Sequence, residues 1–149
     1  MITCKESLLN KAILIAQDAH KNQKDKYDAP YIGHVMRVMN YGKTIDEKIV
    51  GVLHDVVEDS PKYSIERLQQ EGFPEHILFA IECLTKTSAD ENYGDFLART
   101  EQSALAVSVK LNDLRDNMNL RRVNRELTKK DIKRFNKYLK AYHYLINKY

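Results

Sequence analysis

The sequence predicts an all-α fold. Only five glycines and three prolines occur among the 149 residues, so long stretches carry no helix-breaking residue. Helix N-cap patterns recur along the chain, and no segment alternates strictly enough between apolar and polar residues to require a strand, although 107–109 comes closest. The length suits one domain, residues 1–149, that can bury its own core. We therefore expect a compact single-domain helical bundle.

Caps and apolar spacing place the predicted helices. Residues 3–6 have the spacing of a capping box and open a helix that runs to about residue 20. Residues 44–47 repeat this spacing, and we expect their helix to continue through about residue 58. Further helices are predicted over 31–40, 64–72, 74–85, 93–100, 104–117 and 128–149, with a loop at 86–92. The side chains expected to dock the last helix are Tyr138, Leu139, Tyr142, Leu145 and Ile146.

Composition argues against several classes of protein. Hydrophobic residues make up 43% and charged residues 30%, as in a globular protein. Charged or polar residues interrupt every apolar run well before the roughly 20 residues of a membrane span. The first ten residues lack the apolar segment of a secretory signal. Cys4 and Cys83 form no CxxC pair, so we expect neither a disulfide scaffold nor a cysteine zinc finger, and a cytoplasmic location.

The net charge of +3 conceals an uneven distribution. Residues 110–149 hold twelve Lys or Arg against four Asp or Glu. Such a region could bind nucleic acid or an acidic partner. The basic residues are spread along helical turns, however, which is typical of a solvated helix face. Nucleic-acid binding is therefore the least favoured function, and its candidate residues are Arg121, Arg122, Arg125, Lys129, Lys130, Lys133, Arg134, Lys137 and Lys140.

Charges within apolar runs are the most informative feature. Residues 49–57 are apolar around the whole predicted helix except at His54 and Asp55, and such a helix is normally buried. A buried carboxylate without a partner costs several kcal/mol. Asp55 therefore needs a cation or a metal ion. Glu58 and Asp59 follow it by about one helical turn and would lie near it.

The same anomaly occurs on two other predicted helices. Lys110 and Asp113 interrupt the apolar run 104–114, and His34 lies on a helix of valines and methionines. Any one of these residues would be unremarkable in a protein core. Together they indicate a common partner, and one divalent cation would satisfy His34, His54, Asp55 and Asp113 at once.

The order of these residues resembles the HD superfamily of metal-dependent phosphohydrolases. Within it, the chain is similar to the single-domain relatives of the (p)ppGpp hydrolases. The resemblance spans about residues 19–120, and the pattern that follows the His-Asp pair is more specific than the pair alone. Its carriers are His20 with Gln23, Pro30-Tyr31, His34, the run Leu53 to Asp59, Thr85-Lys86, Glu91-Asn92, the run Lys110 to Asp113, and Asn117-Met118.

This resemblance implies an HD-type helical bundle with a mononuclear metal site made by His34, His54, Asp55 and Asp113. The mixed nitrogen and oxygen ligands favour Mn²⁺, with Fe²⁺, Co²⁺ or Zn²⁺ as alternatives. Glu58 and Asp59 correspond to the family's catalytic acidic pair, which activates or positions the attacking water. The residues expected to bind a nucleotide substrate are Lys24, Tyr31, Lys86, Lys110 and Asn117.

Two departures from the family pattern bear on the substrate. Asp25 stands where the family usually has an Arg that packs on guanine, and residues 113–117 read Asp-Leu-Arg-Asp-Asn in place of Asp-Arg-Leu-His-Asn. If this loop still faces the base, Asp25→Arg should tighten guanine nucleotide binding. From the length of 149 residues we expect no synthetase domain beside the hydrolase-like one.

Three functions stay open. The first is removal of the 3′-pyrophosphate of ppGpp, an alarmone of the stringent response, to give GDP and pyrophosphate. The second is hydrolysis of another nucleotide phosphomonoester or phosphodiester. The third is nucleotide binding without catalysis, which the full set of ligands and acids disfavours. A homo-oligomer is also open.

Overall fold

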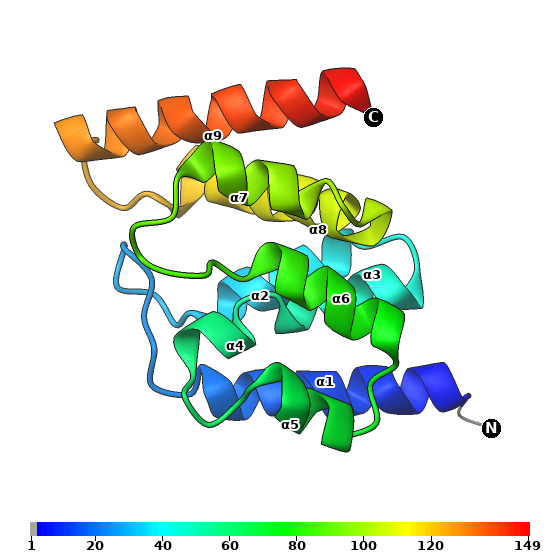
Figure 1. Cartoon of the computed structure of the whole chain (residues 1–149). Coiled ribbons are helices and arrows are strands. Elements are labelled where there is room, and N and C mark those ends of the chain that lie inside the picture. The colour runs from blue at the N-terminus through cyan, green and yellow to red at the C-terminus, as the bar shows by residue number, and fades with distance from the viewer. Residues whose placement is uncertain (1–2) are drawn as a thin grey trace.

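The computed structural model describes residues 3–149, and within that range its regular elements are all helices, joined by loops, with no strand (Figure 1). This confirms the predicted all-α class. The helices are α1 (Cys4–Ala19), α2 (Ile32–Tyr41), α3 (Ile45–Leu53), α4 (Val56–Asp59), α5 (Ile65–Gln70), α6 (Glu75–Leu84), α7 (Tyr93–Thr100), α8 (Ala104–Asn117) and α9 (Lys129–Lys148), with a short 3₁₀ turn at Leu120–Arg122. No helix within residues 3–149 is both long and apolar enough to cross a membrane.

Helix α3 is the centre of the bundle. It packs against α1, α2, α6 and α8, and its last five residues, 49–53, are all buried. Gly51 lies at the crossing with α2, where an added Cβ would come within 3.2 Å of the Met39 backbone. The absence of a side chain therefore lets two helices that carry predicted metal ligands approach closely.

Helix α9 lies across the outside of α8 (Figure 1). Leu145, Tyr138 and Tyr142 pack in the small apolar cluster beneath it, as expected. The prediction was wrong for Leu139 and Ile146, which are 45% and 44% exposed. Each follows an inward residue by one position, a rotation of about 100° that turns its side chain toward solvent.

The predicted helix over residues 44–58 is also wrong in one respect, because it breaks at His54 and Asp55. The Gly51 carbonyl would accept from the Asp55 amide in an unbroken helix, and here it accepts from Nδ1 of His54 at 2.6 Å. Asp55 takes φ −106° and ψ 0° and begins α4. At the start of α3 the Thr44 hydroxyl caps Glu47 as expected, but the Glu47 carboxylate bonds the Lys43 amide instead of completing the box.

Gly51→Ala should separate α2 from α3, because the new methyl group meets backbone that cannot move independently. We expect unfolding to become easier by about 1–3 kcal/mol, the usual cost of overpacking. Urea titration followed by circular dichroism measures this change. A variant as stable as the wild type would show that the two helices are not in limiting contact at Gly51.

Candidate metal centre

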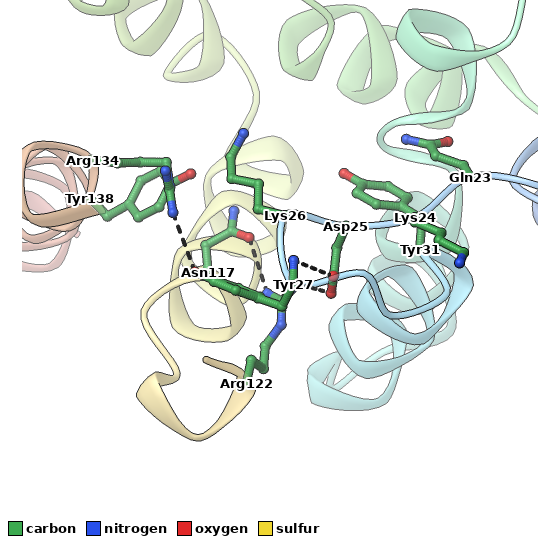
Figure 2. Close-up of a pocket in the computed structure, with 10 residues that line it drawn as sticks. All are labelled: Gln23, Lys24, Asp25, Lys26, Tyr27, Tyr31, Asn117, Arg122, Arg134 and Tyr138. Atoms are coloured by element: carbon green, nitrogen blue, oxygen red, sulfur yellow. Dashed lines mark hydrogen bonds and ion pairs between the residues drawn. The ribbon is translucent and has the colours of Figure 1, made fainter. Parts of the chain in front are cut away.

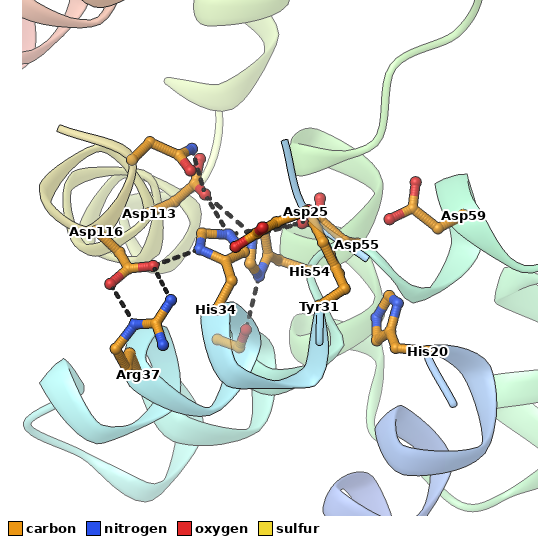
Figure 3. Close-up of polar contacts among 12 residues, drawn as sticks. His20, Asp25, Tyr31, His34, Arg37, His54, Asp55, Asp59, Asp113 and Asp116 are labelled. Carbon is orange, nitrogen blue, oxygen red and sulfur yellow. Dashed lines mark hydrogen bonds and ion pairs between the residues drawn. The ribbon is translucent and has the colours of Figure 1, made fainter. Parts of the chain in front are cut away.

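Two imidazoles are oriented toward a common point by bonds to their far nitrogens (Figure 3). His34, on α2, directs Nδ1 to Oδ2 of Asp116 at 2.6 Å. His54, in the turn after α3, directs Nδ1 to the Gly51 carbonyl at 2.6 Å. Because both acceptors are oxygens without a proton to give, each Nδ1 carries the hydrogen, and in the neutral rings each Nε2 offers a lone pair.

The two Nε2 atoms converge on the Asp113 carboxylate of α8. Oδ1 of Asp113 lies 3.0 Å from Nε2 of His34 and 3.2 Å from Nε2 of His54. Oδ2 of Asp55 lies 3.1 Å from Nε2 of His54 and 3.8 Å from that of His34. Neighbouring ligands of an octahedral ion with bonds of about 2.1 Å are about 3 Å apart. The donor atoms and their spacing therefore fit a divalent ion.

Three of these residues, His34, His54 and Asp113, form a buried group whose ligand atoms all lie within 4.8 Å of one another. Asp55 stands at the edge of this group and accepts a 2.6 Å hydrogen bond from the Tyr31 hydroxyl. The four residues expected from the sequence are thus brought together, three in a tight cluster and Asp55 beside it.

The ionisable groups of the cluster shift one another's pKa values. Burial opposes the charge on His54, yet the carboxylates of Asp55 and Asp113 outweigh it and hold its pKa well above the usual value. Burial also opposes ionisation of Asp113, but Lys110 and both imidazoles hold its pKa well below the usual value. Nζ of Lys110 lies 3.0 Å from Oδ2 of Asp113 and offsets one of the carboxylates.

A buried ion-pair network surrounds His34 and was missed by sequence reasoning. Asp116 is 0% exposed and holds His34, Nε of Arg37 at 2.7 Å and Nη1 of Arg122 at 3.0 Å. A carboxylate behind a ligating histidine fixes its tautomer and ring orientation. One signal was available, because Arg37 follows His34 by three residues and Asp116 follows Asp113 by three, which places them on the same helix faces.

The predicted catalytic pair lies on α4, where Glu58 lines a cavity that also reaches Asp55 and Asp113, and Asp59 lines a separate hollow with Gln23. Oε1 of Glu58 accepts from the Lys86 amide at 2.9 Å, and Oδ2 of Asp59 accepts from Nε2 of Gln23 at 2.9 Å. Partial burial, which removes water from the carboxylates, and the negative charge of Asp55 raise the pKa of both Glu58 and Asp59. A raised pKa suits a carboxylate that must exchange protons.

Two adjoining cavities open beside the cluster and share Tyr31, Asn117 and Tyr138. The inner cavity, about 170 Å³, reaches His54, Asp55 and Asp113 and is also lined by Glu58, Lys86, Lys110 and Lys137. The outer cavity, about 370 Å³, is lined by Lys24, Lys26, Arg122 and Arg134 (Figure 2). All five residues expected to bind substrate therefore border one of the two cavities, whose lysines and arginines suit a phosphorylated ligand.

The contacts of these five residues differ. Lys110 is buried against Asp113, and Asn117 donates to Oδ1 of the same carboxylate at 3.1 Å, so both stabilise the cluster itself. Lys24 is exposed and pairs with Asp28 at 3.4 Å. Lys86 contributes its amide to Glu58 and its side chain to the cavity lining.

Asp25 lines the outer cavity, and its carboxylate also holds the loop together. Its Oδ1 accepts from the amides of Tyr27 at 2.9 Å and Ala29 at 3.0 Å, while Oδ2 pairs with Arg122 at 3.1 Å. Its side chain is only 7% exposed. An Arg at this position would have to replace these structural bonds, so the expected effect of Asp25→Arg on guanine binding stays a prediction.

The fold that carries this arrangement is similar to that of a known protein. A metazoan orthologue of SpoT that hydrolyses ppGpp superimposes on 91% of the chain and 83% of its own, with a TM-score of 0.75 and 21% sequence identity. The chain has the fold of a ppGpp hydrolase. No protein-family model matches it.

Curated proteins named for ppGpp hydrolysis are also similar to the chain in sequence. The guanosine-3′,5′-bis(diphosphate) 3′-pyrophosphohydrolase of Aquifex aeolicus is 28% identical over 135 residues, 83% of this chain and 19% of the relative. A protein of Synechocystis sp., named a probable enzyme of the same activity, is 36% identical over 90 residues, 58% of this chain and 12% of the relative. The chain thus spans less than a fifth of the length of these ppGpp hydrolase relatives.

Asp116→Asn should weaken Mn²⁺ binding by about 10- to 100-fold, the usual effect of losing the carboxylate behind a ligating histidine. Isothermal titration calorimetry measures the affinity. Asp131→Asn is a matched control, because Asp131 is also buried and pairs with Arg125 and Arg134 away from the cluster. Equal losses in the two variants would contradict a specific role for Asp116.

Asp25→Arg should loosen the loop 24–30, since it places a second guanidinium beside Arg122 and removes the oxygen that accepts from two amides. We expect faster proteolysis in this loop and a lower Tm. Asp25→Asn, which can keep Oδ1 as an acceptor, should be milder. A variant Asp25→Arg with wild-type proteolysis would show that the loop does not depend on these bonds.

Proposed function

We propose that the chain is a metal-dependent phosphohydrolase that removes the 3′-pyrophosphate of ppGpp, giving GDP and pyrophosphate. The observation that carries this proposal is the convergence of His34, His54, Asp55 and Asp113 beside a cavity lined by cations. The fold shared with a ppGpp hydrolase and the relatives named for this activity support the substrate.

In this proposal the same four residues hold one divalent ion, with Mn²⁺ favoured by the mixed nitrogen and oxygen donors. When bound, the ion would withdraw charge from a phosphate group and make water more acidic. Lys110 and Asn117 keep the Asp113 carboxylate in place, and Tyr31 does the same for Asp55.

Glu58 and Asp59 are the proposed proton acceptors. Both lie one helical turn beyond His54 and Asp55, and their raised pKa values bring proton exchange closer to neutral pH. The Lys86 amide orients Glu58, and Gln23 orients Asp59. The pair would position the attacking water and take its proton as the bond to phosphorus forms.

The substrate would occupy both cavities. We place the reacting pyrophosphate in the inner cavity, near Lys86, and the nucleoside in the outer cavity, between Tyr31, Tyr138 and Lys24. The single-domain organisation and a cytoplasmic location, consistent with the free cysteines Cys4 and Cys83, belong to the same proposal. A homo-oligomer is compatible with it.

One observation favours a second substrate class. Asp25 and Arg122 neutralise each other in the wall of the outer cavity, so this loop presents no guanidinium of its own to a guanine. Another nucleotide phosphomonoester or phosphodiester would use the same cluster and the same acids. Product analysis with a panel of nucleotides separates the two candidates.

Glu58→Gln should reduce kcat for ppGpp by about 10²–10⁴-fold, the range for a positioned general base. Mn²⁺ affinity should persist, because Glu58 lies outside the ligand cluster. Turnover is followed as release of GDP and pyrophosphate by the full chain with Mn²⁺. Because the pKa of Glu58 is raised, wild-type activity should decline on acidification at a higher pH than for an ordinary glutamate.

Asp55→Ala provides the blank for this assay, since it removes a proposed ligand and should abolish Mn²⁺ binding and turnover together. Full activity in Glu58→Gln would refute the role given to Glu58. Mn²⁺ binding by the wild type without ppGpp turnover would favour the second substrate class. If the wild type binds no divalent ion, the catalytic proposal fails.

A further inference from the structure

A hydrogen-bonded chain of three side chains runs from the protein interior to Asp59. Nδ1 of His20, at the end of α1, lies 2.7 Å from Oε1 of Gln23, and Nε2 of Gln23 lies 2.9 Å from Oδ2 of Asp59. Figure 3 shows His20 and Asp59 close together, on the side of Tyr31 away from Asp113. His20 and Tyr31 have ring centroids 5.1 Å apart.

The direction of every bond in this chain follows from Asp59. An ionised carboxylate can only accept, so Gln23 must present its NH₂ group to Asp59. Its carbonyl oxygen then faces His20, and Nδ1 of His20 must carry the hydrogen. Each group thereby fixes the orientation of the next.

Stability alone does not explain a histidine at position 20. It is 1% exposed, and its Nε2 atom is buried without a hydrogen-bond partner in the described residues. An unsatisfied buried nitrogen destabilises the fold, and an apolar side chain of similar size would avoid the penalty. What the imidazole provides, and an apolar side chain would not, is the Nδ1–H bond to Gln23.

We propose that His20 and Gln23 are positioning residues that hold the Asp59 carboxylate in the orientation needed for catalysis. Gln23 acts directly on Asp59, and His20 acts through Gln23 by preventing its amide from turning over. This inference rests on the proposed function for the catalytic role of Asp59, although the orientation of the bonds does not depend on it.

The test compares Gln23→Met, which keeps size and removes both hydrogen bonds, with Asp59→Asn and the double variant, all in the full chain with Mn²⁺ and ppGpp. Gln23→Met should lower kcat by about 10- to 100-fold, as expected for a misplaced catalytic group. KM should change less than kcat, and Mn²⁺ affinity measured by calorimetry should persist. In the Asp59→Asn background, Gln23→Met should have little further effect, because coupled residues are not additive.

Two variants of His20 sharpen the test. His20→Leu should lower kcat in the same way, whereas His20→Asn, whose amide can donate near the position of Nδ1, should recover most of that loss. Gln70→Met is the matched control, since Gln70 is exposed on α5 and should keep wild-type kcat. If His20→Leu does not fold, Gln23→Met and its double variant still decide the question.

Additive losses in the double variant, or a Gln23→Met effect confined to KM or to Mn²⁺ affinity, would overturn the inference. Nitrogen-15 NMR of the His20 ring gives an answer without turnover, because the wild type should show hydrogen on Nδ1. Hydrogen on Nε2 alone would refute the bond order even in an inactive protein. If Asp59→Asn turns over at the wild-type rate, the proposed role of Asp59 fails instead.

Discussion

The buried carboxylate of Asp113 is the constraint around which the site is organised. An unpaired charge in the interior would cost several kcal/mol. Lys110 and Asn117 donate hydrogen bonds to Asp113, and Nε2 of His34 and Nε2 of His54 lie 3.0 and 3.2 Å from its Oδ1. Lys110 and Asn117 lie on α8 with Asp113, whereas His34 comes from α2 and His54 follows α3, and these three helices pack against one another. The geometry of the site therefore depends on how α3 packs against α2 and α8.

Arg122 connects this site to the wall of the outer cavity. One end of its guanidinium pairs with Asp116, which holds His34, and the other pairs with Asp25, which folds the loop 24–30. The side chain is 13% exposed, so these bonds are shielded from solvent and salt. Two ion pairs, Asp25–Arg122 and Arg122–Asp116, therefore connect the loop to the orientation of His34.

Local features of the sequence predicted most of the helices, because caps such as Thr3 and apolar spacing act within a few residues. Charges within apolar runs predicted which side chains meet. The break at His54 was not predictable from helix periodicity, since it depends on a side chain competing for the Gly51 carbonyl. The Arg122–Asp25 pair joins residues 97 positions apart, and no local pattern encodes it. Asp116 was seen only as a departure from a motif, whereas burial shows it to be a partner of His34.

The positions of the ligands along the chain have a consequence for folding. His34, His54 and Asp113 belong to segments that an unfolded chain would hold far apart, so an ion bound to all of them acts as a reversible cross-link that the unfolded state cannot form. Such an ion stabilises the folded protein by about 2.7 kcal/mol at a free concentration 100 times its Kd. If the chain binds the proposed ion, the supply of metal would influence the stability of the fold as well as the proposed activity. A chelator would act on both.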